Sequence, residues 1–243
     1  MLEQAGIAFY SLAVVGVLLT GISKSGFAGG AGVVAVPLLA LVMPIPQAVA
    51  LMLPLLLVMD VKTIWLYRRT FDADTLKRIV PAALLGILVA GSGFALLSES
   101  VLQVSLAVFS MLFASWQNLI PLIKKLPGSA IIWGCLSGIT STLLHAGGPP
   151  INVYLISRQL EKKIWLGTAA IFFGIMNLTK VIPYTLNLQW NDELFYLDLL
   201  LLPVALIGVS IGKWLQHTLD EIWFIYSCRI LLFFSGFLLL IKL

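Results

Sequence analysis

The chain has 243 residues, of which 60% are hydrophobic and only 11% are charged, and its formal net charge is +4. Soluble domains carry about 25% charged residues, so this composition excludes an ordinary soluble protein. The basic residues stand in short loops between apolar runs, which makes the charge a signal of membrane topology and does not point to nucleic acid. The cysteines and histidines show no metal-ligand spacing, and no cofactor is expected.

Ten apolar segments follow one another along the chain. A helix needs about 20 mostly apolar residues to cross a hydrocarbon core roughly 30 Å thick. Four of the segments are short for a full crossing, and each short pair is joined at a Gly-rich break. The expected segments span 7–22, 26–43, 47–67, 79–97, 101–120, 130–144, 149–157, 164–186, 194–213 and 222–241. This order predicts an all-α, polytopic membrane helical bundle with two short broken-helix hairpins.

The two halves of the chain resemble each other. Gly29-Gly30 precedes Gly147-Gly148 by 118 residues, and Lys62 precedes Lys180 by the same number. A Pro-x-Ala-x-x-Gly pattern follows in each half, in the same order. Residues 1–125 are therefore predicted to form a first membrane repeat and residues 126–243 a second.

Basic residues in the loops predict the orientation. The loops with Arg68-Arg69, Lys77-Arg78, Lys124-Lys125 and Lys162-Lys163 are expected in the cytoplasm. Five segments per half is an odd number, so the second repeat should be inverted relative to the first, with both termini outside. The chain is expected to be a multi-pass protein of a cell membrane, the inner membrane in a bacterium.

The broken segments indicate transport. Backbone groups at membrane depth must be hydrogen-bonded, so irregular backbone is tolerated only where protein or a water-filled cavity satisfies it. Short, Gly/Pro-interrupted segments at matching positions of an inverted repeat are typical of a transporter's central substrate site. The N-terminal ends of the helices that start near Gly32 and Pro149 would favour an anion through their N–H groups and partial positive charge.

These motifs resemble those of a known family. The stretch from Gly26 to Gly32, followed by Pro37-Leu38-Leu39, is similar to the first-repeat signature of the sulfite exporter TauE/SafE family, the TSUP anion permeases. The stretch from Gly138 to Pro150 resembles its counterpart in the second repeat. The resemblance covers almost the whole chain and implies secondary transport of sulfur-containing anions such as sulfite or sulfonates.

Residues in or near the breaks are the candidate anion ligands. Lysine, histidine and asparagine side chains can donate hydrogen bonds to an anion, and ionisable residues within a membrane span indicate function. Asn177 and Lys180 stand three residues apart and so share a helix face, which Tyr184 continues. The candidate substrate-binding residues are Lys24, Gly29, Gly30, Gly32, His145, Gly147, Gly148, Asn152, Asn177 and Lys180.

Two residues are candidates for carrying a coupling proton. His145 has an ordinary pKa near physiological pH, and Asp60 is a carboxylate inside a span. Each also has a structural interpretation: a hydrogen-bonded histidine, and a partner for a lysine. Lys62 could serve the substrate like Lys180 or extend to the surface. Arg229, inside the last segment, is expected to pair with Asp198, and the alternative is that it binds an anion.

Other functions remain open at this point. The chain could be a passive anion channel, a transporter of another small organic anion, or a structural subunit of a larger complex. An intramembrane enzyme is a further alternative, because Ser141 and His145 stand four residues apart and could form a nucleophile–base pair. Expected partners are a small anionic substrate, membrane lipid and, through small residues on the helix faces, a second copy in a homodimer.

Overall fold

A computed structural model describes residues 6–27, 32–93, 96–115, 129–187, 190, 192–216 and 221–242. All regular elements in these ranges are helices, so the all-α, polytopic bundle is confirmed. Five helices are long and apolar enough to cross a membrane: α1 (Ile7–Gly26), α3 (Ile45–Tyr67), α4 (Ala73–Gly93), α9 (Lys162–Asn187) and α10 (Asp192–Leu215). The remaining elements are η2 (Gly32–Val34), α2 (Ala35–Ala40), α5 (Glu99–Ala114), α7 (Ala130–Leu144), α8 (Gly148–Ser157) and α11 (Glu221–Ile241).

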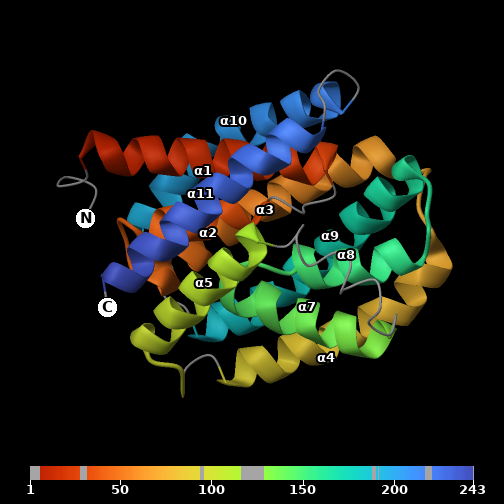
Figure 1. Ribbon diagram of the computed structural model, residues 1–243, viewed down its shortest axis with the longest axis horizontal. Helices are drawn as coiled ribbons and strands as arrows, with labels where there is room; N and C mark the ends of the chain where they lie inside the picture. Colours follow the sequence, from red (N-terminus) through yellow and green to blue (C-terminus); the bar gives the residue numbers. More distant parts are fainter. Residues whose placement is uncertain are drawn as a thin grey trace.

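The helices form two outer groups around a central pair. Figure 1 shows α1, α10 and α11 along one side of the molecule, α4 and α7 along the opposite side, and α3 with α9 between them. The start of α1 and the end of α11 lie at the same end of the bundle (Figure 1). Because α3 and α9 are covered from both sides, polar residues on them can be buried far from lipid.

Helix packing is the same in the two halves. The helix α1 packs against α10, as α7 packs against α4, and α3 packs against α10, as α9 packs against α4. The helices α1 to α5 correspond in order to α7 to α11. Under this correspondence the α1–α10 pair becomes the α7–α4 pair, and the α3–α10 pair becomes the α9–α4 pair. An inverted repeat would produce this pattern. The division at residues 125 and 126 falls outside the described residues and stays a prediction.

Glycines permit the closest of these helix contacts. A Cβ atom on Gly138 of α7 would lie 2.2 Å from the Ala83 carbonyl oxygen of α4. A Cβ atom on Gly208 of α10 would lie 2.7 Å from the Leu18 carbonyl oxygen of α1. Small residues at such positions let membrane helices approach backbone to backbone, so the outer helices are held tightly against one another.

The first break differs from its prediction. The sequence segments placed it after residue 22, whereas α1 continues to Gly26. Nothing in Ser23-Lys24-Ser25 interrupts the helical hydrogen bonds, and Lys24 therefore lies in the last turn of α1. Residues 28–31 lie outside the described residues, and the chain resumes at η2. At the second break α7 ends at Leu144, and His145 adopts the left-handed conformation with φ 51°.

Hydrogen bonds at one end of the bundle connect segments rich in basic residues. Arg158 after α8 donates to Asp74 at 3.1 Å and to Thr75 at 3.0 Å, both in the first turn of α4. The Tyr67 hydroxyl at the end of α3 donates to the Ser25 carbonyl oxygen at 2.6 Å and lies 2.8 Å from the side-chain amide of Gln216. The ends of α1, α3, α8 and α10 and the start of α4 thus share one face. Its assignment to the cytoplasm stays a prediction.

Candidate functional site

A small polar cavity lies at the centre of the bundle, between α1, α3, α9 and the break between α7 and α8. Its volume is about 30 Å³, enough for a water molecule or two. In this conformation the walls therefore close around the polar groups. The lining residues are Thr20, Lys24, Leu56, Ser141, His145, Gly148, Phe173, Asn177 and Lys180.

One cluster beside the cavity contains a buried ion pair. Lys24 of α1 forms a salt bridge with Asp60 of α3, and both side chains are buried. Asn177 of α9 donates to the other oxygen of Asp60 at 2.5 Å. The Lys24 ammonium also lies 5.7 Å from the centre of the Phe173 ring, within the range of a cation–π interaction. Both carboxylate oxygens therefore have donors, as a buried carboxylate requires.

The second cluster contains a lysine without a carboxylate among its hydrogen-bond partners. The Lys180 ammonium is fully buried. It donates to the Ser141 hydroxyl at 3.0 Å, to the Ser141 carbonyl oxygen at 3.2 Å and to Nδ1 of His145 at 2.9 Å. An ammonium has three N–H donors, and these three acceptors are all uncharged.

The contacts of His145 define its protonation. Its Nε2 lies 2.9 Å from the Val49 carbonyl oxygen. A carbonyl oxygen can only accept, so Nε2 carries a hydrogen, and Nδ1 accepts from the Lys180 ammonium. The ring is therefore neutral. The left-handed backbone of His145 at the end of α7 turns the ring toward α9 and α3.

The charges around the cavity do not cancel. When Lys180 is protonated, Lys24 and Lys180 bring two positive charges, Asp60 brings one negative charge, and His145 is neutral. Asp60 lies two helical turns before the end of α3, and Lys180 lies two turns before the end of α9, so each is about 10 Å inside its helix. One unbalanced positive charge at membrane depth attracts an anion.

A proline in α3 exposes backbone beside this site. Pro54 has no N–H, so the carbonyl oxygen of Ala50, four residues earlier, loses its helical partner. The indole N–H of Trp190 donates to that oxygen at 3.0 Å. The neighbouring carbonyl of Val49 is the one that accepts from His145. Side chains from the second half of the chain thus satisfy the weakened turn of α3.

The structure brings most of the predicted polar and ionisable candidates together. Lys24, Asp60, His145, Asn177 and Lys180 all lie at the cavity, and Gly148 lines it. Sequence reasoning missed Ser141 as an acceptor for Lys180, because a serine in an apolar segment carries no signal of its partner. It also missed Pro54. A proline inside a predicted helix is a visible signal, because it leaves the carbonyl oxygen four residues earlier, here that of Ala50, without its helical partner.

Other candidates lie elsewhere. Gly32 begins η2, and Gly29 and Gly30 lie outside the described residues. Asn152 of α8 does not line the cavity, and its side-chain oxygen is buried without a hydrogen-bond partner. Gly147 has a packing role, because a Cβ there would lie 2.8 Å from the Ser141 side chain.

The start of α8 has fewer free N–H groups for binding an anion than the sequence predicted. Pro149 and Pro150 have no N–H, and the Ile151 N–H donates to the Gly147 carbonyl oxygen at 3.4 Å. In the first turn, Gly148 is the residue that lines the cavity and carries an N–H group. Positive charge therefore comes mainly from the lysine side chains and less from the helix end.

The surroundings of Lys62 and of the Ser141–His145 pair differ from what the sequence predicted. Lys62 donates to the Leu206 carbonyl oxygen at 2.8 Å and to Ser210 at 2.6 Å, both on α10, and so does not share the surroundings of Lys180. The nucleophile–base pair of an enzyme is not formed, because both ring nitrogens of His145 are engaged by Lys180 and Val49. The Ser141 hydroxyl instead accepts from Lys180 at 3.0 Å.

Comparisons with known proteins identify the family of the chain. Neither the curated proteins nor the solved structures contain a significant match to the chain. The family model described as sulfite exporter TauE/SafE matches residues 12–239, which is nearly the whole chain. The chain is therefore a multi-pass membrane protein that belongs to the sulfite exporter TauE/SafE family of transporters.

Proposed function

We propose that this protein is a secondary transporter that moves a small sulfur-containing anion, such as sulfite or a short sulfonate, across the cell membrane. The observation that carries the proposal is the fully buried Lys180, whose hydrogen-bond partners are all neutral. An isolated charge inside a membrane is expensive. A substrate anion beside Lys180 would supply the missing countercharge.

The groups around the cavity suit a compact oxyanion. Lys180 and Lys24 supply charge, and Asn177 and Thr20 supply neutral polar groups at the wall. Asp60 holds Lys24 and Asn177 in place and lowers the local positive charge to one. A site with one excess positive charge favours a singly charged substrate over a more highly charged one.

The small cavity favours a carrier over an open channel. A volume of about 30 Å³ leaves room for water but not for a sulfonate. The anion would therefore enter when the helices around the breaks separate, first on one face and then on the other. Such alternating access around a central site is the usual behaviour of inverted-repeat transporters.

His145 is positioned to couple a proton to this exchange. When an anion takes over the Lys180 ammonium, Nδ1 of His145 loses its donor and becomes free to bind a proton. Asp60 is held by two donors and fits an ion-pair role better than a proton carrier. We place the protein in a cell membrane, the inner membrane in a bacterium, where a proton gradient is present and a homodimer can form.

Uptake into proteoliposomes tests the proposal. Purified protein would be reconstituted and given labelled sulfite, thiosulfate and short sulfonates, with and without an imposed pH gradient. We expect saturable uptake of one of these anions, lost in Lys180→Gln and kept in Lys62→Gln. Folded protein that moves none of them would overturn the sulfur-anion assignment. Unsaturable flux, with a rate far above that of a carrier, would instead support the channel.

A further inference from the structure

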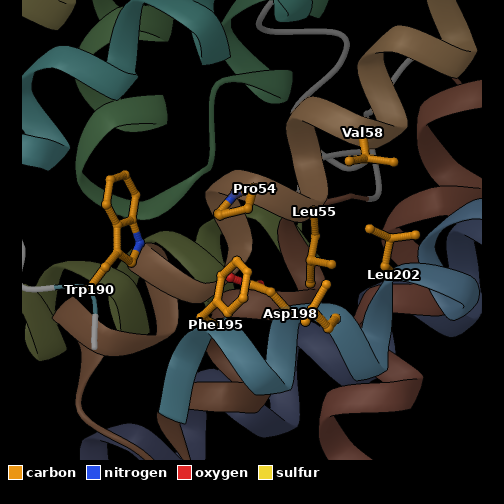
Figure 2. A pocket seen from close by; sticks show the side chains of 8 residues that line it. Pro54, Leu55, Val58, Trp190, Phe195, Asp198 and Leu202 are labelled. Carbon is orange, nitrogen blue, oxygen red and sulfur yellow. The ribbon is translucent and has the colours of Figure 1, made fainter. Parts of the chain in front are cut away.

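A second cavity lies between α3 and α10, apart from the polar site. Its volume is about 330 Å³, within the range of small-molecule pockets. Figure 2 shows Pro54, Leu55 and Val58 of α3 facing Phe195, Asp198 and Leu202 of α10. Trp190 closes one end, and Leu199 completes the wall.

Asp198 is the polar exception in this wall. The residue is only 8% exposed, and its Oδ1 is buried without a hydrogen-bond partner. Its expected partner Arg229 lines a different cavity, with Ser115 and Tyr226, and donates to the Ala114 carbonyl oxygen. The predicted Asp198–Arg229 pair is therefore wrong: both residues sit in apolar segments, and the sequence does not reveal which cavities their helices face.

Charged groups on the helices packed against α10 are engaged elsewhere. Lys24 of α1 and Asp60 of α3 pair with each other, and Lys62 of α3 donates to the Leu206 carbonyl oxygen. Tyr10 of α1 packs edge-on against the neighbouring Phe9. None of these lines the cavity, nor do the other described ionisable residues of α10, which are Asp192, Glu193, Tyr196 and Lys213.

A lone carboxylate in such a wall restricts what it can bind. An ionised carboxylate without a partner is strongly disfavoured in an apolar environment, and such a group tends to take up a proton. A metal cation would need several oxygen ligands, whereas Asp198 is the one residue with side-chain oxygens among the described residues of the lining. The geometry therefore favours a proton over a metal ion.

The weakened turn of α3 connects this carboxylate with the anion site. Pro54 and Trp190 line the Asp198 cavity, and the Trp190 indole donates to the Ala50 carbonyl oxygen that Pro54 leaves without a partner. The next carbonyl toward the N-terminus, that of Val49, accepts from His145 at the anion site. A change of hydration around Asp198 would thus act on the same turn that holds His145.

We infer that Asp198 is a proton-binding site of the transporter, loaded in this closed conformation and emptied when α3 and α10 separate and admit water. The inference rests on the proposed function for its role in anion movement. The binding of the proton itself is a separate claim. His145 at the anion site and Asp198 in the apolar cavity would then take part in one cycle through the turn at Pro54.

Infrared spectroscopy tests proton binding without any need for transport. A protonated carboxyl group has a carbonyl stretching band that an ionised carboxylate lacks. We expect this band in the wild-type protein in lipid at neutral pH, its loss in Asp198→Asn, and its retention in Asp192→Asn. Asp192 is an exposed residue of the same helix and gives a matched control. A spectrum that is the same in Asp198→Asn and the wild type would overturn the inference.

Transport assays then test the coupling. In Asp198→Asn we expect anion exchange without a gradient to stay within about twofold of wild type, which also shows that the variant folds. Accumulation driven by a pH gradient should fall at least tenfold, and Asp198→Glu should restore it. Wild-type accumulation in Asp198→Asn, or dependence on a sodium gradient in place of a pH gradient, would contradict the inference. Absence of anion flux in the wild type would refute the proposed function and leave the infrared result standing.

Discussion

The two lysines of the central site differ in what surrounds them. Lys24 is matched by Asp60, whose second oxygen is held by Asn177. Lys180 has the Ser141 oxygens and His145, all of them uncharged. Both lysines are buried. The first cluster is thus electrically complete, whereas the second contains a charge that a substrate can neutralise.

This difference separates scaffold from binding site. A satisfied ion pair at membrane depth ties α1 to α3 and, through Asn177, to α9. A buried lysine without a countercharge has no such structural justification and indicates a ligand. If the halves arose by duplication, the repeat accounts for the shared helix arrangement, and later substitutions account for the difference between the two lysine clusters. Each prediction below changes one side of this comparison.

The largest effect is expected from breaking the ion pair. Asp60→Asn leaves two lysine charges without a carboxylate and should lower the free energy of unfolding by about 3–5 kcal/mol. Replacing both partners, as Lys24→Met with Asp60→Leu, should recover most of this loss, because no unpaired charge remains. Thermal unfolding in detergent measures both, with the exposed Asp74→Asn as control. Equal stability of the single and double variants would contradict the scaffold role.

Lys180→Gln should remove substrate binding and leave folding intact. Its partners are neutral, so loss of its charge strands no carboxylate. We expect uptake to fall by about 100-fold, equivalent to about 2.8 kcal/mol of binding free energy, with an unfolding temperature close to wild type. A large loss of stability with normal uptake by the surviving protein would reverse the roles assigned to the two clusters.

His145→Gln tests the neutral partner of Lys180. Glutamine keeps a hydrogen-bonding group but cannot take up a proton near neutral pH. We expect about a tenfold loss of gradient-driven uptake, with exchange in the absence of a gradient affected less. Flux measured over a series of external pH values checks this. An unchanged pH dependence would remove His145 from the coupling step.

Tyr184→Phe should have the smallest effect. The Tyr184 hydroxyl donates to the Thr142 carbonyl oxygen at 2.5 Å and lies on the same face of α9 as Lys180. Loss of one such hydrogen bond lowers stability by about 1 kcal/mol, and uptake should stay within threefold of wild type. The exposed Tyr196→Phe is the matched control. A loss of uptake comparable with that of Lys180→Gln would place the hydroxyl in the binding site.

Segment order and most of the cavity residues could be predicted because both depend on local patterns. The lengths of the apolar segments and the Gly/Pro breaks between them predict the helices. Charged residues are rare inside membrane spans, so Lys24, Asp60 and Lys180 could be identified as candidates. The pairing between them could not be predicted, because Lys24–Asp60 and Lys180–Ser141 join residues 36 and 39 apart through tertiary packing. The same holds for Asp198, whose isolation depends on which helix faces meet.

Equilibrium binding to purified protein tests the central claim most directly. Labelled sulfite, or the anion that uptake assays select, would be titrated against the wild type, Lys180→Gln and Lys62→Gln at fixed salt. We expect saturable binding by the wild type and Lys62→Gln, and its loss in folded Lys180→Gln. Binding by Lys180→Gln with wild-type affinity would contradict the claim that the buried lysine without a countercharge is the anion site.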